Sequence, residues 1–157
     1  MEDTAHELKK NEKTAIVEGL HQALADTSVA TMKSQFYHWN VKGMSFGSLH
    51  AMFQEIYEDH FVGQDDLAER VRALGAPAEG SYKAFLERTK IKEATEVISA
   101  EDMVKDMTET QETIAATLRT LAEEAGEQRD PLTEDLAIAR AQVHEKFAWM
   151  LRAHLEG

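Results

Sequence analysis

Long stretches without proline, in which apolar residues follow a helical period, constrain this fold most. Only two prolines occur among the 157 residues, and the first of them is Pro77. Before it, apolar residues recur at three- or four-residue spacing over residues 14–41 and again over residues 45–74, on either side of Gly43. Each span is long enough for a helix of about 40 Å. The first half of the chain therefore predicts two long helices joined by a short loop.

The second half of the chain predicts a long connection and two further long helices. Residues 78–98 have mixed character, and only residues 82–86 suggest a brief amphipathic helix. The third long helix is predicted over residues 99–126, because a capping serine precedes its apolar positions and a glycine closes them. Asp130 followed by Pro131 predicts the start of the last helix, as an N-cap acid with proline at the first helical position.

The fold class that follows is all-α: a four-helix bundle with a short extra helix in the connection between the second and third long helices. A long connection lets those two helices run parallel. Residues 14–157 are predicted to form this single domain, as their length allows. Residues 1–13 alternate charges with almost nothing apolar, and are predicted to form a short flexible arm.

Composition narrows the expected partners and compartment. The 29 acidic and 17 basic residues give a formal charge of −12, which repels nucleic-acid and membrane phosphates, attracts cations and also favours solubility. There is no cysteine, which removes disulfides, thiolate ligands and a thiol nucleophile. Neither an apolar run of about 18 residues nor a secretory signal pattern occurs, so no membrane association and a cytoplasmic location are expected.

Four side chains on the first two predicted helices could bind a metal ion. His38 falls in the last turn of the first helix and His50 in an early turn of the second, so a short loop would bring them together. Imidazole nitrogens suit iron, zinc and copper. Asp65 and Glu69 are four residues apart and project from one helix face, as a chelating carboxylate pair would. Solvated carboxylates also recur at this spacing, so the acid pair alone decides nothing.

Distance along the second helix separates these four residues into two groups. The fifteen residues from His50 to Asp65 correspond to roughly 22 Å of helix, whereas a metal–ligand bond is about 2 Å long. The four side chains are therefore either unrelated, or they complete a site across two subunits. A two-fold axis crossing the middle of the second helix would place the histidines of one subunit against the acids of its mate, giving two identical sites per dimer.

Other chemistries find less support. A di-iron site within one subunit would use Glu-x-x-His on two helices, and only residues 18–21 offer it. Phosphate-binding glycine loops and His-Glu-x-x-His motifs are absent. The acidic run from Glu55 to His60 is interpreted as an outward face that could guide ions, and His144 and His154 as surface or core-edge residues rather than ligands.

The residues around the candidate ligands resemble the signature of the Dps family, the mini-ferritins of the ferritin superfamily. The likeness covers nearly the whole chain and includes residues 144–152 near its end. The matching positions in the central stretch are His38-Trp39-Asn40-Val41-Lys42-Gly43, Phe46, Leu49-His50, Phe53, Tyr57, Asp65, Ala68-Glu69-Arg70, Arg72, Leu74-Gly75 and Pro77.

This resemblance implies a ferritin-like bundle assembled into a hollow homododecamer. Such shells oxidise Fe(II), preferably with hydrogen peroxide rather than dioxygen, store the ferric mineral and protect against oxidative stress. By position, His38 and His50 of one subunit would form a ferroxidase site with Asp65 and Glu69 of its partner. Glu69 would bridge two irons, and Trp39 would lie beside the site.

One ligand position departs from the family pattern. Where the family usually has an acid, this chain has Gln54, whose amide oxygen can coordinate a metal ion without offsetting its charge. Glu55 points about 100° away around the helix and is a poor substitute. The second iron is therefore expected to be labile. The alternative is a shell that takes up metal with weak or no ferroxidase activity. A metal-free scaffold bundle would require the placement of the histidines and acids to be accidental.

Two further expectations concern the surface of the assembly. Asp130 and Asp135 match carboxylates at the three-fold pores of the family, where iron would enter. Family members that condense DNA commonly use lysine-rich tails, whereas the charges of residues 1–13 are balanced. DNA binding is therefore expected to be weak or absent.

Overall fold

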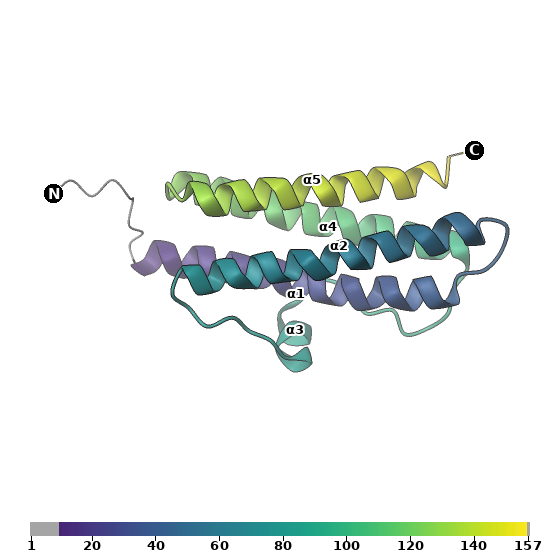
Figure 1. Cartoon of the computed structure of the whole chain (residues 1–157), viewed down its shortest axis with the longest axis horizontal. Helices are drawn as coiled ribbons and strands as arrows, with labels where there is room; N and C mark the ends of the chain where they lie inside the picture. The colour runs from purple at the N-terminus through teal and green to yellow at the C-terminus, as the bar shows by residue number, and fades with distance from the viewer. Residues whose placement is uncertain (1–9, 157) are drawn as a thin grey trace.

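Five helices make up the computed structural model, in which residues 10–156 are described. They are α1 (Lys10–Asn40), α2 (Phe46–Ala73), α3 (Tyr82–Arg88), α4 (Ala100–Glu127) and α5 (Pro131–Ala153). The four long helices lie lengthwise against one another, and the short α3 lies to one side of them, against α1 (Figure 1). No strand occurs among the described residues, so the predicted all-α bundle with its extra helix is confirmed.

The first helix begins earlier than its apolar pattern predicts. Helix α1 starts at Lys10, so residues 10–13 of the predicted arm are helical. The Thr14 hydroxyl donates to the backbone oxygen of Lys10 at 2.8 Å within this first turn. A helix can extend into solvent beyond its apolar stripe, and the pattern marks only the part that packs. The remainder of the predicted arm, residues 1–9, lies outside the described residues, as does Gly157.

Two glycines with left-handed backbone conformation end the first two helices. Gly43 has φ 109° and lies in the loop that reverses the chain between α1 and α2. Gly75 has φ 95° and closes α2, where its N–H donates to the Arg72 oxygen at 2.9 Å. Because glycine adopts these angles without steric cost, both positions stop a helix as predicted. The first turn places α2 antiparallel beside α1 (Figure 1).

The long connection between α2 and α4 is tied to α1 by polar contacts. Asp26 of α1 is completely buried and accepts hydrogen bonds from the Thr89 hydroxyl at 2.7 Å and the Lys90 N–H at 2.8 Å. Arg88, at the end of α3, pairs with Glu79 at 2.8 Å. These contacts hold the connection against α1 as it crosses that helix, and α4 then runs parallel to α2 (Figure 1).

The junction between α4 and α5 differs from its prediction in one detail. Gly126 lies inside α4 and does not end it. A Cβ there would collide with the carboxylate of Glu134, so this glycine allows α5 to approach closely. The chain reverses at Arg129, which has φ 60°. Asp130 caps α5 as predicted, accepting from the Thr133 N–H at 3.3 Å.

The core consists of two hydrophobic clusters, one toward each end of the bundle. One contains Leu20 and Leu118, and the other contains Phe53 and Met107. On α2 the two clusters are separated by residues 57–66, within which no side chain belongs to either. The layer between the clusters is polar and buried, and it is described below. No helix in the described part of the chain is long and apolar enough to cross a membrane.

Candidate metal centre

The turn between α1 and α2 brings His38 and His50 into direct contact. Their imidazole rings stack with centroids 3.8 Å apart. His38 Nδ1 lies 2.7 Å from the backbone oxygen of His50, and His50 Nδ1 lies 2.8 Å from that of His38. Because a carbonyl oxygen only accepts, each Nδ1 carries the proton and donates. Both rings are thus held in the tautomer whose Nε2 lone pair is available to a metal ion.

Aromatic side chains hold this histidine pair in place. Tyr57 packs edge-on against His38 with centroids 5.3 Å apart, and Phe46 stacks on His50 at 4.9 Å. His38 is buried and His50 is half-buried, so the pair lies at the edge of the bundle. Trp39, predicted beside the site, is 62% exposed in the single chain. Two preoriented imidazoles at an accessible edge could supply two ligands to a metal ion.

The two predicted carboxylate ligands lie farther along α2. Asp65 and Glu69 are exposed and, one turn apart, share a helix face. Among residues 10–156, no group of three or more His, Cys, Asp or Glu side chains is placed to hold one metal ion. The structure therefore brings the two histidines together and leaves the carboxylates apart, as the helix spacing predicts for one chain.

Gln54 lies one turn after His50 and contacts Glu58, a member of the acidic run that begins at Glu55. Its Nε2 donates to Glu58 Oε1 at 2.8 Å. Because the amide nitrogen is used in this bond, the amide oxygen remains as the coordinating atom. The sequence indicates this contact, because Gln54 and Glu58 are four residues apart and share a helix face, whereas Glu55 directly follows Gln54 and does not.

The two aspartates predicted at a pore have different surroundings. Asp130 is 5% exposed, caps α5 and accepts from Arg70 NH2 at 2.9 Å. It also pairs with the Thr133 hydroxyl. Asp135, on the next turn of α5, is exposed. Asp130 therefore holds α5 against α2 in the single chain, whereas Asp135 presents its carboxylate to solvent.

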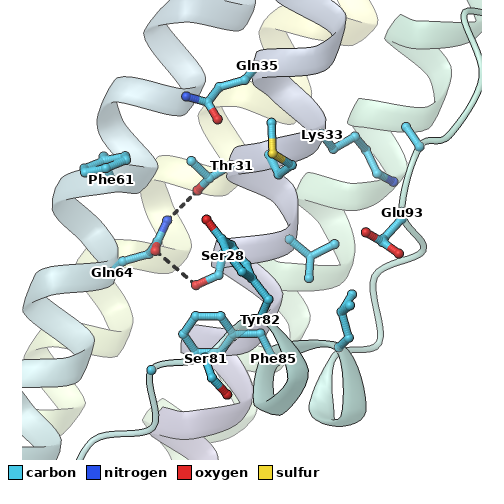
Figure 2. A pocket seen from close by; sticks show the side chains of 15 residues that line it. Ser28, Thr31, Lys33, Gln35, Phe61, Gln64, Ser81, Tyr82, Phe85 and Glu93 are labelled. Carbon is cyan, nitrogen blue, oxygen red and sulfur yellow. Dashed lines mark hydrogen bonds between the residues drawn. The ribbon is translucent and has the colours of Figure 1, made fainter.

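An open groove lies between α1, α2 and α3. Its volume is about 620 Å³, and Phe61, Tyr82 and Phe85 contribute aromatic rings to its lining (Figure 2). Gln64 fastens the helices beneath it, donating to the Thr31 hydroxyl at 2.6 Å. Phe61 is 65% exposed and Tyr82 is 85% exposed, so much of this apolar surface faces solvent in the single chain.

A further polar group lies inside the bundle, where none was predicted. His60 and His144 are both completely buried, which corrects their interpretation as parts of an outward face and of a surface or core edge. Their rings lie 4.6 Å apart between α2 and α5. The sequence does indicate this burial. His60 lies four residues after Ile56 and His144 lies three residues before Phe147, so each falls on the apolar face of its helix.

The two buried imidazoles belong to a closed ring of hydrogen bonds that joins α2, α4 and α5. On α2, His60 Nδ1 contacts Asp59 Oδ2 at 3.0 Å. On α4, the Gln111 amide contacts His60 Nε2 at 2.9 Å and His144 Nδ1 at 2.6 Å. On α5, Arg140 NH2 contacts His144 Nε2 at 3.4 Å and returns to Asp59 Oδ2 at 2.8 Å.

Burial and charge shift the pKa values within this ring. Burial lowers the pKa of His60. Burial, together with His60 and the positive charge of Arg140, holds the pKa of His144 well below its usual value. Burial raises the pKa of Asp59, but the bonds from His60 and Arg140 outweigh it and bring this pKa well below its usual range. At neutral pH the ring therefore contains two neutral imidazoles and one ion pair.

Comparison with known proteins agrees with this architecture. The family of ferritin-like domains matches residues 17–157. The DNA protection during starvation protein of Porphyromonas gingivalis is 35% identical over 147 residues, covering 94% of this chain and 92% of that protein. DNA protection during starvation protein 2 of Bacillus anthracis is 36% identical over 140 residues, covering 89% and 96% respectively.

Solved structures give the same result. The Dps protein from Vibrio cholerae O1, described as a member of a broad superfamily of ferritin-like diiron-carboxylate proteins, aligns with a TM-score of 0.91 and 31% identity over 99% of this chain and 100% of that one. Dps from Staphylococcus aureus aligns with a TM-score of 0.90 and 33% identity over 96% and 99%. These likenesses define the class as ferritin-like. Within that class, the chain belongs to the Dps family.

Proposed function

We propose that this protein oxidises Fe(II) at sites shared between two subunits and stores the ferric product inside a homododecameric shell. The observation that carries the proposal is the pair of preoriented imidazoles, His38 and His50, beside which residues 10–156 of the same chain place no third His, Cys, Asp or Glu ligand. Membership of a ferritin-like family supports iron as the metal. Iron is here both substrate and cargo.

The positions of the ligands along α2 support a two-fold arrangement. His50 and Glu69 are equally distant in sequence from the midpoint between residues 59 and 60, and so are Gln54 and Asp65. Two antiparallel copies of α2 related by an axis through that point would bring each of these pairs together twice. Each interface would then hold two identical sites, each with histidines from one subunit and carboxylates from the other.

The surface between the two half-sites is suited to such an interface. Phe61 lies close to the midpoint on α2, and Tyr82 lines the groove beside it (Figure 2). Met32 and Leu86 also line this groove and are exposed. Burying apolar surface is favourable by about 25 cal/mol per Å². A second copy of this chain is the proposed occupant, because it would cover the apolar face and complete both sites at once.

Each group at the shared site has a definable role in the chemistry. Neutral imidazoles donate lone pairs to the iron, while Asp65 and Glu69 supply the negative charge that stabilises the more highly charged Fe(III). Glu69 is proposed to bridge the two irons, with Trp39 beside them. Two Fe(II) ions each lose one electron, and hydrogen peroxide, the proposed preferred oxidant, accepts both with two protons and becomes two water molecules.

Removing both proposed carboxylate ligands tests this function. In the variant Asp65→Asn with Glu69→Gln, we expect the initial rate of Fe(II) oxidation by peroxide to fall by about 100-fold or more, since loss of outer-shell partners alone typically costs 10- to 100-fold. Stopped-flow absorbance measures the rate. Both residues are exposed, so the fold should be kept. The matched control is Glu55→Gln with Asp66→Asn, which removes the same charge from exposed positions on α2.

The result also separates the two candidate functions. If the wild-type protein oxidises Fe(II) no faster than buffer and still retains metal, the protein is a sequestering shell. If the carboxylate variant reacts at the wild-type rate, the proposed site is wrong.

Replacing Gln54 should strengthen the weaker of the two metal positions. In Gln54→Glu, we expect the second divalent ion per site to bind at least about tenfold more tightly, because a carboxylate offsets the ion's charge and an amide does not. The like charge of Glu58 one turn away would oppose this gain only slightly, by a few tenths of a kcal/mol. Calorimetric titration of the apo shell with Co(II) measures both affinities, with Glu58→Gln as control. Two equally tight ions per site in the wild type would contradict the prediction.

DNA binding is not part of this proposal. The formal charge of −12 per subunit would repel phosphate in any assembly of identical copies. The name DNA protection during starvation protein describes those two relatives and is not transferred to this chain. The absence of DNA binding and the cytoplasmic location stay predictions from the sequence.

A further inference from the structure

Each polar atom in the buried ring of Asp59, His60, Gln111, His144 and Arg140 acts as either a donor or an acceptor, and the chemistry of the side chains fixes which. A carboxylate only accepts, so His60 Nδ1 carries a proton and donates it to Asp59. His60 Nε2 therefore accepts from the amide nitrogen of Gln111. The amide oxygen then accepts from His144 Nδ1, and His144 Nε2 accepts from Arg140, which only donates.

This closed arrangement leaves no position for an additional proton. A proton on His60 Nε2 would face the amide nitrogen of Gln111, which is also a donor. Rotating the Gln111 amide by 180° would let its oxygen accept from a protonated His60 Nε2, but its nitrogen would then face His144 Nδ1. His144 would have to accept at Nδ1 and carry its proton on Nε2, where it would face the Arg140 guanidinium, which is also a donor. Protonating either histidine therefore breaks the ring at some point.

The ring lies where it can control the packing of α5. It separates the two hydrophobic clusters of the core and joins three of the four long helices. The charged groups acting on the two imidazoles are Asp59 from α2 and Arg140 from α5. Helix α4 contributes only the neutral amide, and no charged group from the described part of α1 acts on either ring.

The backbone of α2 also makes room for this ring. A Cβ at Gly63 would lie 2.5 Å from Arg140 Cζ, so glycine at this position allows the guanidinium to reach Asp59. Arg140 is 7% exposed, and its Nε is buried without a hydrogen-bond partner. Its two bonds to Asp59 are therefore the main compensation for burying this charge, and opening the ring would weaken the attachment of α5.

We propose that this ring is an acid-operated clamp, which holds α5 against α2 and α4 while both imidazoles are neutral and releases it when either binds a proton. This inference does not depend on the proposed iron chemistry. An unfolded histidine has a pKa of about 6.5. Above that pH neither state takes up protons at these residues, and the clamp contributes fully. Below it, the unfolded chain binds up to two protons that the folded ring excludes. Stability is therefore lost as the pH falls, and the unfolding equilibrium constant rises by up to about 100-fold per pH unit.

The test is urea unfolding of the assembled full-length protein between about pH 5 and pH 8, followed by circular dichroism and light scattering. In His144→Gln, the new amide can donate to Gln111 and accept from Arg140, but it does not titrate. We expect the unfolding equilibrium constant of this variant to rise by up to about tenfold per pH unit instead of about 100-fold, because the unfolded chain then binds one proton fewer. In Gln111→Glu, a carboxylate accepts from both imidazoles, so protonation is tolerated and acid sensitivity should also fall. His154→Gln is the matched control, because this histidine is exposed.

The two variants separate a switch from a merely structural network. If both are uniformly less stable than wild type but show the same pH dependence, the proposal is overturned. A reduced pH dependence in either variant, with the control unchanged, supports it. Should neither variant assemble, the wild-type protein still decides. Less than about a threefold change in the equilibrium constant per pH unit below pH 6.5 would exclude the clamp, and a larger change supports it.

Discussion

Shells reassembled from equal amounts of two inactive variants will regain about a quarter of the wild-type rate of Fe(II) oxidation. One variant carries His38→Ala with His50→Ala, and the other carries Asp65→Asn with Glu69→Gln. Each variant alone lacks one half of every site, so each alone is expected to be inactive.

The recovery follows from the geometry of a shared two-fold site. In a dimer of one variant with the other, one of the two sites receives both damaged halves and the other receives both intact halves. Random pairing makes about half of all dimers mixed, so about a quarter of all sites are complete. A site built within one subunit would show no such recovery.

The measurement compares initial rates by stopped flow before and after dissociation and reassembly of the mixture. A mixture of the two preformed shells that has not been dissociated serves as the control and should stay inactive. Mass spectrometry of differently tagged subunits shows whether mixed shells have formed. No recovery in shells shown to be mixed would refute sharing of the site between subunits.

Replacing Asp130 with alanine is expected to lower the free energy of unfolding by about 3 kcal/mol. The loss of the N-cap of α5 accounts for about 1 kcal/mol of this. The remainder comes from leaving Arg70, whose side chain is only 18% exposed, without the carboxylate 2.9 Å away; this lies below the 3–5 kcal/mol of a fully buried pair. Urea unfolding at neutral pH gives the value.

Asp135 provides the matched control for this change. It is exposed on the same helix, so Asp135→Asn should alter stability by less than about 0.5 kcal/mol. If this residue also guides iron through a pore, as we propose from the family resemblance, the variant will take up Fe(II) more slowly with no loss of stability. An Asp130→Ala variant as stable as wild type would contradict the capping role, and unchanged uptake in Asp135→Asn would contradict the pore role.

The contact between His38 and His50 could be predicted from the sequence because it depends on local geometry. Helical spacing and one glycine turn are sufficient to place His38 beside His50, since a short loop between antiparallel helices allows few arrangements. The same arithmetic separated Asp65 and Glu69 from the histidines. What it could not provide was the orientation of the rings. The crossed Nδ1 bonds to backbone carbonyls depend on how the last turn of α1 meets α2.

The sequence interpretation was wrong where contacts join helices that are distant along the chain. Asp59 and Arg140 are 81 residues apart, and His60 and Gln111 are 51 apart. A pattern on one helix can show that a histidine lies on the apolar face, but it cannot show which partners will satisfy it there. For the same reason the sequence pattern predicts a helix stop at Gly126, whereas this glycine lies inside α4 and accommodates Glu134 of the next helix.

The sequence by itself determined the helices, their order and the separation of His50 from Asp65 along α2, because helical period, capping and rise per residue are properties of a single segment. Only the tertiary structure decided that Asp130 is buried and pairs with Arg70, and that two histidines close a buried ring. Those outcomes depend on which side chains from separate helices meet in the interior, where each buried polar group must find a partner.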